Sequence, residues 1–239
     1  GLEETEKMKN EFISSVSHEL RTPLTSIRGW VETLMTLDDP TDENYRKGLE
    51  IINNETGRLN NMVEELLDFS RLQNGRIRME CRPLDLVAEL TDAVLFCEAR
   101  IRREGLLLHY TEPEEMIPVY ADPDMMQRAL HNLLGNAMHH IGADGIFVLR
   151  AFRCSEGVRV EVEDHGPGIA AADLPYIFDR YYRSRSDAGK QGTGLGLSIT
   201  KAIFQQHSFR FGVQSTVGKG TTFWFVMSDL PYVDGLEGN

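Results

Sequence analysis

His18 is the first residue whose type and surroundings could do chemistry, because apolar residues spaced for an amphipathic helix flank it. It lies two positions from both Val16 and Leu20, about 200° around such a helix from each, so its imidazole is expected to face solvent. A neutral imidazole is a nucleophile, the carboxylate of Glu19 beside it can take its proton, and Thr22 lies one turn further on. Most exposed histidines are merely solvated, so the neighbours, rather than the histidine alone, predict a reactive side chain.

Two asparagines, Asn132 and Asn136, suggest a site for a metal ion and phosphates. They are one turn apart on the helix expected after Asp122, so their amides lie on one face. Amide oxygens suit a Mg²⁺ ion that keeps several of its waters and bridges phosphate groups. The same spacing also fits plain surface asparagines, so the pair needs a nucleotide pocket nearby to have a function. The residues expected on the core-facing side of this helix are Leu130, Leu133, Leu134 and Ala137.

Asp164 follows an alternating stretch, Val158 to Glu163, and falls on the same side as its valines. A carboxylate that faces an apolar layer needs a hydrogen-bond donor, which an adenine amino group could supply. Gly166 and Gly168 come next and have no side chain to keep a flat ligand from the backbone. This pattern predicts a turn that binds a base, whereas a plain strand that ends in a turn is the simpler alternative.

A glycine-rich segment precedes another apolar helical stretch and is expected to bind phosphate. Small residues at a helix N-terminus leave backbone N–H groups available to phosphate oxygens. The segment matches neither a P-loop nor a Rossmann fingerprint. The polar chain before it predicts a lid, in which Arg183 and Lys190 can meet phosphate charge, while Arg185 is taken as solvated. The residues of the glycine-rich segment are Gly192, Thr193, Gly194, Leu195, Gly196 and Leu197.

Taken together, these segments resemble the bacterial sensor histidine kinases. Residues 12–24, around His18-Glu19, resemble the phosphoacceptor box of that family. The resemblance covers nearly the whole chain, from about Lys7 to Val226. Four further segments resemble, in order, the N, G1, F and G2 boxes of the GHKL or Bergerat-type ATP-binding domain: Asn132-Leu-Leu-Gly-Asn136-Ala, Asp164-His-Gly166-Pro-Gly168, Phe178 in Ile-Phe-Asp-Arg-Tyr-Tyr-Arg, and 192–197.

The resemblance implies a reaction and a role for individual residues. It implies that the γ-phosphoryl group of Mg-ATP passes to His18, with Glu19 as the base, and then to an aspartate of a response regulator. It implies that Thr22 orients water when that regulator is dephosphorylated. It also implies that Asp164 binds the adenine amino group and that Asn136 coordinates Mg²⁺. ATP and Mg²⁺ are therefore the expected cofactors, and a receiver domain is an expected partner.

Two positions depart from the family pattern. His139 and His140 replace a frequent lysine and tyrosine, and His139, on the face of the two asparagines, carries only part of a charge near pH 7. Its contact to phosphate is expected to be weaker for that reason. The two histidines do not form a metal-binding pair, because adjacent helix residues point about 100° apart. Ser208-Phe209 replaces a usual pair of glycines, which predicts a repacked turn rather than lost chemistry.

Two amphipathic helices must position the histidine. Apolar residues recur every three or four positions between Ile13 and Leu34, and again between Tyr45 and Leu66 after a proline-containing break. A two-helix hairpin cannot enclose its own apolar stripes, whereas two hairpins related by a twofold axis form a closed four-helix bundle. We therefore expect a homodimer, with a hairpin packed on the rest of the same chain as the alternative.

The remaining elements predict an α/β layered domain. The whole fold is expected to be α+β: a helical-hairpin dimerisation domain, which forms a four-helix bundle in the dimer, followed by an α/β sandwich ATP-binding domain of the Bergerat or GHKL type. Helices are expected at 84–103, 122–141 and after Gly196, and strands at 106–110, 118–121, 146–153, 158–163, 210–213 and 221–227. The expected domains are the hairpin at 1–75, a hinge at 76–84, the ATP-binding domain at 85–230 and a C-terminal tail at 231–239.

The composition of the chain disfavours some classes of partner and indicates where the protein is located. The chain has 239 residues, of which 41% are hydrophobic and 26% charged, as in one or two globular domains. Its net charge of −12 disfavours nucleic acid and anionic lipid as partners. Its three cysteines have no spacing typical of a disulfide framework or a zinc site. This cysteine usage indicates a reducing, cytosolic setting. No apolar run is long enough to span a bilayer, and the resemblance implies a membrane-bound sensor of which this chain is the cytoplasmic part.

Two other functions fit parts of the pattern. A nucleotide-responsive dimeric scaffold, whose histidine is no longer phosphorylated, would fit the departures at His139 and Ser208-Phe209. ATP binding without phosphoryl transfer would distinguish it from a kinase. An ATPase of the chaperone or topoisomerase kind would share the glycine-rich boxes, but it needs no exposed His-Glu pair on a helical hairpin.

Overall fold

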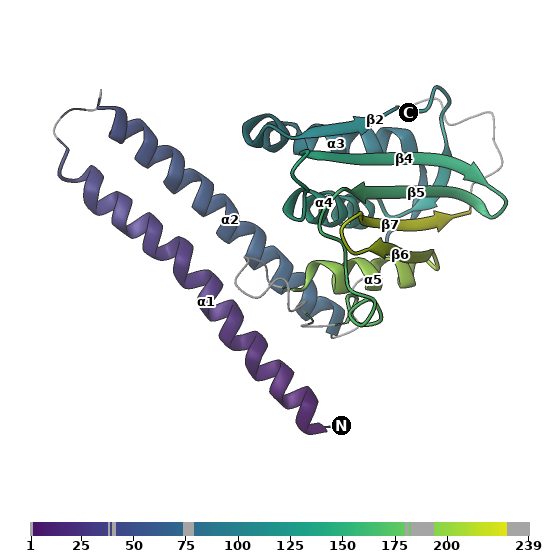
Figure 1. Cartoon of the computed structure of the whole chain (residues 1–239), viewed down its shortest axis with the longest axis horizontal. Coiled ribbons are helices and arrows are strands. Elements are labelled where there is room, and N and C mark those ends of the chain that lie inside the picture. The colour runs from purple at the N-terminus through teal and green to yellow at the C-terminus, as the bar shows by residue number, and fades with distance from the viewer. Residues whose placement is uncertain are drawn as a thin grey trace. The chain divides into compact units, whose positions relative to one another are not determined.

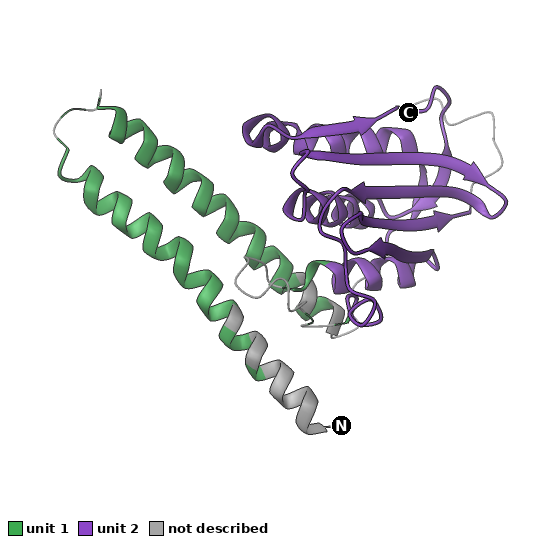
Figure 2. Cartoon of the chain, in the orientation of Figure 1, with its two compact units in different colours: residues 1–76, 179–196 green, residues 77–178, 197–239 purple. Residues whose placement is uncertain are grey.

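A computed structural model describes residues 2–37, 39, 42–73, 79–179, 182 and 194–228. Side chains are described within these ranges except for residues 2–9, 11, 12, 15, 68, 69, 72 and 73. The chain divides into two compact units (Figure 2). One contains residues 1–76 and 179–196, and the other contains residues 77–178 and 197–239.

The first unit contains the two expected helices, which lie side by side as a hairpin (Figure 1). Helix α1 spans Leu2–Leu34 and α2 spans Glu43–Gln73, so each contains one of the predicted apolar stretches. The carboxylate of Asp42 accepts a hydrogen bond from the N–H of Asn44, 2.7 Å away, at the start of α2. Gly48 is buried between the helices, where a Cβ atom would lie 2.8 Å from the ring of Trp30. A side chain at this position would therefore push α1 and α2 apart.

Part of the apolar stripe remains exposed on both helices of the hairpin. On α1, Leu24 is 54% exposed and Val31 is 41% exposed, one heptad apart. On α2, Leu49 is 49% exposed and Val63 is 46% exposed, two heptads apart. Such a row of exposed apolar side chains is typical of a surface that associates with another helix pair. The homodimer stays a prediction, and these residues form the face that it would bury.

The second unit is a layered domain with a mixed sheet. Among the described residues the sheet has five strands in the order β2-β4-β5-β7-β6. Strands β2 and β4 pair in parallel and the other neighbours pair antiparallel. Helices α3, α4 and α5 lie on one side of it (Figure 1). The bounds are α3 Leu86–Glu104, β2 Leu107–Tyr110, α4 Pro123–His139, β4 Ile146–Cys154, β5 Gly157–Asp164, α5 Gly196–Gln206, β6 Arg210–Thr216 and β7 Gly220–Met227.

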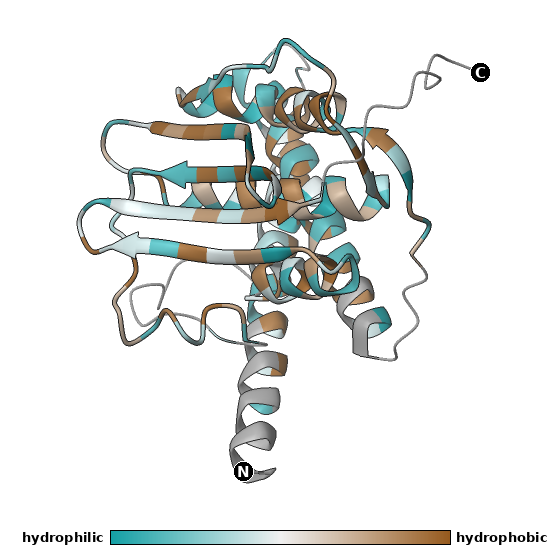
Figure 3. Cartoon of the chain, turned by 90° about the vertical axis from the view of Figure 1, so that its right-hand side faces the viewer, coloured by the Kyte–Doolittle hydropathy of each residue, from teal (hydrophilic) through white to brown (hydrophobic). Residues whose placement is uncertain are grey.

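Alternation along the strands separates the core from the outer face of the sheet. In β5 the valines at 158, 160 and 162 are buried and alternate with residues of intermediate burial, and Figure 3 shows that the strands of the sheet carry both apolar and polar residues. Helix α4 begins as predicted, with Asp122 as its N-cap and Pro123 at the first position. The four residues that the sequence assigns to the core-facing side of α4 are all buried: Leu130, Leu133, Leu134 and Ala137.

One sequence prediction is wrong, because a strand was missed before α3. The sequence predicts a helix from Leu84, but residues Arg82–Asp85 form strand β1, which pairs antiparallel with β3 (Pro118–Ala121). The carboxylate of Asp85 accepts hydrogen bonds from the N–H groups of Val87 and Ile117, both 3.0 Å away. It caps α3 and ties its start to a distant segment, so the helix begins at Leu86.

None of the described helices combines the length and the apolar character that crossing a membrane requires.

Candidate functional site

His18 lies on the surface of α1, as the helical spacing predicts. Its neighbour Glu19 is only 8% exposed, so a carboxylate sheltered from water lies next to a solvent-facing imidazole. The hydroxyl of Thr22 donates to the carbonyl of His18, 3.2 Å away. Pro23 lies inside α1 and has no N–H, so it donates no hydrogen bond within the helix. The structure therefore brings the three predicted phosphoacceptor residues onto one stretch of helix.

The polar face of α4 lies against the start of α5. The side-chain amide of Asn132 donates to the hydroxyl of Thr200, 3.4 Å away, and Thr200 is fully buried. Asn136, one turn later, is half-buried, and His139 is exposed in the last turn. The ring of His139 makes an edge-on contact with that of His140, with 4.9 Å between centroids. The two asparagines thus share a face, as predicted, and that face lies beside the helix that follows the glycine-rich segment.

Asp164 ends β5 and is 3% exposed, so the inward orientation that the strand alternation predicts is confirmed. Backbone N–H groups of Gly166, 2.8 Å away, and of Thr221 donate to its carboxylate. Burial nevertheless raises the pKa of Asp164 to about 6, because desolvation of the charged form outweighs these donors. A buried carboxylate with remaining acceptor capacity is suited to an amino group of a bound base.

The glycines after Asp164 are required by close backbone packing. A Cβ atom on Gly166 would lie 2.0 Å from the carbonyl oxygen of His140, just after α4. A Cβ atom on Gly168, whose φ is 72°, would lie 2.2 Å from the carbonyl oxygen of Thr216. The turn that contains Asp164 is therefore held between the end of α4 and the β6–β7 turn, and no larger residue fits at either glycine.

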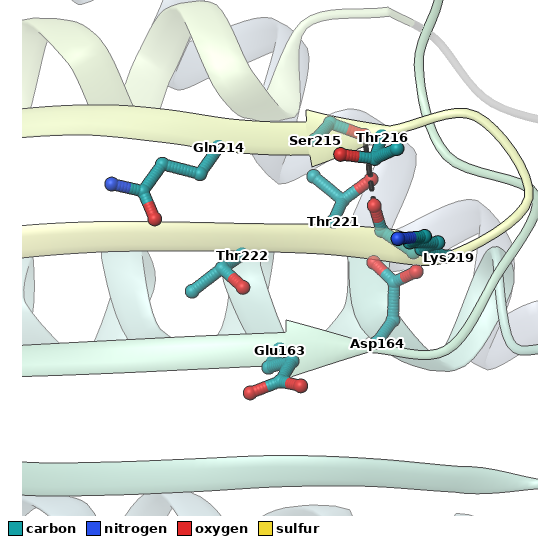
Figure 4. Close-up of a pocket in the computed structure, with 9 residues that line it drawn as sticks. Glu163, Asp164, Gln214, Ser215, Thr216, Lys219, Thr221 and Thr222 are labelled. Atoms are coloured by element: carbon teal, nitrogen blue, oxygen red, sulfur yellow. Dashed lines mark hydrogen bonds between the residues drawn. The ribbon is translucent and has the colours of Figure 1, made fainter.

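Two hydroxyl side chains near Asp164 were not found from the sequence. Thr221 is the register partner of Asp164 on β7 and is buried. Ser215 contacts the hydroxyl of Thr221 at 2.9 Å and accepts a hydrogen bond from the N–H of Ile169 at 2.8 Å. Figure 4 shows these side chains beside a polar hollow at the ends of β5, β6 and β7. The residues that line this hollow are Glu163, Asp164, Gln214, Ser215, Thr216, Lys219, Gly220, Thr221 and Thr222.

The segment between Asp164 and α5 is anchored by an aromatic side chain. The ring of Phe178 packs edge-on against Phe211 and Phe223 of the sheet, at centroid distances of 5.4 Å and 6.0 Å. Further on, Gly194 has a φ of 68° and Leu195 is fully buried. Gly196 and Leu197 form the first residues of α5. The predicted phosphate-binding residues Arg183, Lys190, Gly192 and Thr193 lie outside the described residues.

Ser208 and Phe209 lie in the turn between α5 and β6, and the predicted repacking of this turn stays a prediction. Ser208 has a φ of 58°, a conformation that glycine adopts more easily. Phe209 stacks on the ring of His207, with 4.7 Å between centroids. His207 itself is fixed at both nitrogens: Nε2 accepts the N–H of Asp122 and Nδ1 donates to the carbonyl of Ile203, each at 2.9 Å. Burial lowers the pKa of His207, which agrees with a neutral ring in this position.

The residues on α4 fit Mg²⁺ better than a metal that needs several protein ligands. Among the described residues, no three histidine, cysteine, aspartate or glutamate side chains are grouped so that they could hold a metal ion. Mg²⁺ usually takes one or two oxygen ligands from the protein and completes its shell with water and phosphates. An amide oxygen, such as the one that Asn136 carries, is of the type that Mg²⁺ accepts.

Comparison with known families gives two matches, which cover separate stretches of the chain. Residues 8–75 match the His Kinase A (phospho-acceptor) domain. Residues 121–231 match the family described as histidine kinase-, DNA gyrase B-, and HSP90-like ATPase. These two stretches contain His18 and Asp164, respectively.

Comparison with curated proteins gives sensor proteins as relatives. Drug sensory protein A of a Synechocystis strain is 36% identical over 234 residues, which cover 93% of this chain and 35% of that protein. Sensor protein SrrB of Staphylococcus aureus is 34% identical over 227 residues, which cover 91% of this chain and 38% of that protein. The chain thus spans well under half the length of these relatives.

Comparison with solved structures gives similar folds. The histidine kinase ThkA in complex with the response regulator TrrA has a TM-score of 0.64 at 27% identity, over 93% of this chain and 62% of that chain. Full-length ShkA in complex with AMPPNP also has a TM-score of 0.64 at 27% identity, over 93% and 47%. The Acinetobacter baumannii histidine kinase AdeS has a TM-score of 0.62 at 25% identity, over 88% and 97%.

Proposed function

The chain belongs to the histidine kinases, and from this membership we propose that it is the catalytic core of a sensor kinase that phosphorylates itself on His18. The phosphoryl group would then pass to an aspartate of a response regulator. The observation that supports this most strongly is that a solvent-facing histidine on a helical hairpin and a buried carboxylate, Asp164, occur in one chain. The similar structure of ThkA was solved with a response regulator, and that of ShkA with AMPPNP.

The nucleotide would be held by residues from three elements. Asp164 accepts the adenine amino group, and the glycines beside it let its turn pack closely against the end of α4 and the β6–β7 turn. Asn136 on α4 is the proposed Mg²⁺ ligand, with Asn132 and His139 on the same face toward the phosphates. Mg²⁺ would offset the phosphate charge, which matters in a chain whose net charge is −12. The start of α5 offers backbone N–H groups to the phosphates.

The phosphoryl transfer is a displacement at phosphorus. A ring nitrogen of His18 supplies its lone pair to the γ-phosphorus, the bond from that phosphorus to the β–γ bridging oxygen breaks, and ADP leaves with the electron pair. Glu19, which is sheltered from water, takes the ring proton. Thr22 lies one turn from the histidine, and its hydroxyl would orient the water that hydrolyses the phosphate from the regulator. Catalysis then rests on positioning and charge neutralisation.

Assembly and location follow from the same proposal. The exposed apolar face of α1 and α2, which includes Leu24 and Val31, would be covered by the same face of a second chain. The resulting four-helix bundle is the proposed homodimer, with the receiver domain of a response regulator as the second partner. We further propose that the chain is the cytoplasmic part of a membrane-bound sensor, because ATP and response regulators are found in the cytoplasm.

Incubation with Mg-ATP labelled at the γ-phosphate tests this function. We expect label that is stable in alkali and lost in acid, as a phosphoramidate bond requires, and that is absent from His18→Gln. A matched control is His109→Gln, since His109 is an exposed histidine on β2 outside the proposed machinery, and it should label normally. Label that survives in His18→Gln or resists acid would contradict the proposal. ATP binding with no label would favour the dimeric scaffold instead.

A further inference from the structure

His165 lies between the proposed adenine ligand and the first glycine of its turn, and the proposed function assigns it no role. Its Nδ1 lies 2.7 Å from a carboxylate oxygen of Asp144, and its Nε2 lies 3.6 Å from a carboxylate oxygen of Glu163. Asp144 belongs to the turn between α4 and β4, which is 21 residues away in sequence. The imidazole therefore connects the end of β5 with the turn that follows α4.

The carboxylate of Asp144 is held in place by its own backbone. Its second oxygen accepts a hydrogen bond from the N–H of Ile146, 3.1 Å away, at the start of β4. The turn is closed by a hydrogen bond from the N–H of Gly145 to the carbonyl of Gly142, at 3.1 Å. An acceptor fixed in this way loses little freedom when it pairs with the imidazole, so the pair is preorganised.

The two segments that this pair joins also touch through their backbones. A Cβ atom on Gly142 would lie 2.0 Å from the carbonyl oxygen of His165, and one on Gly166 would lie 2.0 Å from that of His140. The N–H of His140 in turn caps α4 by donating to the carbonyl of Asn136 at 3.0 Å. Any sliding between these segments would therefore change the distance between Asn136 and the turn that contains Asp164.

We propose that His165 is a positioning residue for the nucleotide: by pairing with Asp144 it fixes the end of α4 against the turn of Asp164. The pairing thereby keeps the distance between Asp164 and the asparagines of α4 constant. The site can then bind the base and the phosphates of one nucleotide at the same time. This inference rests on the proposed nucleotide site and adds a residue to it. His165 acts through Asp164 and Asn136 and does not itself touch the nucleotide.

The charge of the imidazole strengthens this connection. The hydrogen bond to Asp144 is the main cause that raises the pKa of His165, and the carboxylates of Glu163 and Asp164 act in the same direction. A neutral ring keeps the hydrogen bond to Asp144 through Nδ1–H but loses the electrostatic attraction of all three carboxylates. Nucleotide affinity should therefore fall at alkaline pH. The charged and titratable groups on the elements packed against the ring are Asp144, Glu163, Asp164, Arg150, His140 and Lys219.

A double-mutant cycle tests the proposal with the full chain. His165→Gln and Asp144→Asn should each raise the KM for Mg-ATP about three- to fivefold, the range of a partly exposed ion pair, with kcat for His18 labelling unchanged. The double variant should lose no more than either single variant, because both remove one interaction. Arg100→Gln is the control, since Arg100 forms an equally exposed pair with Glu104, 2.9 Å apart on α3, and its KM should not change.

The outcomes separate this inference from the proposed function. Wild-type protein that labels His18, together with unchanged KM values in both single variants or additive losses in the double variant, would overturn the role of His165 alone. Absence of labelling in wild-type protein would instead overturn the proposed function. If His165→Gln fails to fold, the role of His165 is tested by Asp144→Asn and by the pH profile of the wild-type KM. The wild-type KM should rise above the raised pKa of the ring, whereas that of Asp144→Asn should change less.

Discussion

Replacement of Asp164 by asparagine separates what this residue does for binding from what it does to stability. The carboxylate is 3% exposed, and its burial raises the pKa from 3.8 to about 6. A shift of about two units corresponds to about 3 kcal/mol of unfavourable free energy for the folded protein whenever the group is ionised. Asparagine has nearly the same shape but no charge to desolvate, so Asp164→Asn should stabilise the protein without bound nucleotide.

The pH dependence follows from the direction of the shift. The folded protein holds the Asp164 proton more tightly than the unfolded chain, so stability is lost as pH rises from 3.8 to about 6 and is constant above that range. We expect Asp164→Asn to raise the free energy of unfolding by about 1–3 kcal/mol near pH 7.5 and by progressively less toward about pH 4. The lower end of that range applies if the amide leaves the N–H of Gly166 or Thr221 without an acceptor.

Nucleotide binding should change in the opposite direction. The carboxylate of Asp164 accepts hydrogen bonds from the groups around it, which include the proposed adenine amino group. The NH₂ group of an asparagine side chain cannot accept a hydrogen bond from any of these donors. Loss of a hydrogen bond to a charged acceptor costs about 1.5–3 kcal/mol, so the affinity for ATP should fall about 10- to 150-fold. Wild-type affinity should also decrease below about pH 6 as Asp164 is protonated, whereas the affinity of Asp164→Asn should be independent of pH in that range.

Urea denaturation without nucleotide and titration calorimetry with ATP, each from about pH 5 to about pH 8, measure both effects. Asp92→Asn is the matched control, since Asp92 is an exposed aspartate on α3 and neither quantity should change. A variant that is less stable than the wild type at neutral pH and binds ATP equally well would contradict both expectations. Asp164 would then be a structural residue and not the base-binding group.

Three further predictions concern other parts of the chain. Ser208→Gly should raise the free energy of unfolding by about 1 kcal/mol in urea denaturation, because the φ of 58° is strained for serine. Burial lowers the pKa of His207, so the unfolded chain takes up the proton first and stability should fall as pH decreases below about 6.5; His207→Gln should lose that part of the slope of unfolding free energy against pH. Leu24→Glu combined with Val31→Glu should convert the proposed dimer into a monomer in light scattering, whereas Thr33→Glu, an exposed change on the same helix, should not; a dimer that persists in the double variant would contradict the assigned interface.

Local signals predict much of the fold. The apolar spacing predicts both helices of the hairpin, and Asp122-Pro123 predicts the start of α4. The alternation of β5 places Asp164 in the interior before any tertiary information is used. Each of these features depends on residues within a few positions of one another, which is why the sequence alone is sufficient.

Other features depend on residues that are distant in sequence. The bond from Asp85 to the N–H of Ile117 spans 32 residues and decides where β1 ends and α3 begins. Thr221 lies beside Asp164 only because β5 and β7 pair in one register. The pairing of His165 with Asp144 likewise depends on how the α4–β4 turn packs. Propensity and periodicity carry no information on such pairings, so these parts of the site could not be predicted.

Locating the phosphoryl group tests most directly whether the chain phosphorylates itself on His18. After incubation with Mg-ATP, the protein can be digested and analysed by mass spectrometry at neutral or alkaline pH, which preserves a phosphoramidate. We expect the phosphoryl group on the imidazole of His18, and we expect brief acid treatment to remove it. An acid-stable phosphate on the neighbouring Ser17 or on Thr22, or an unmodified His18 in protein that binds ATP, would contradict it.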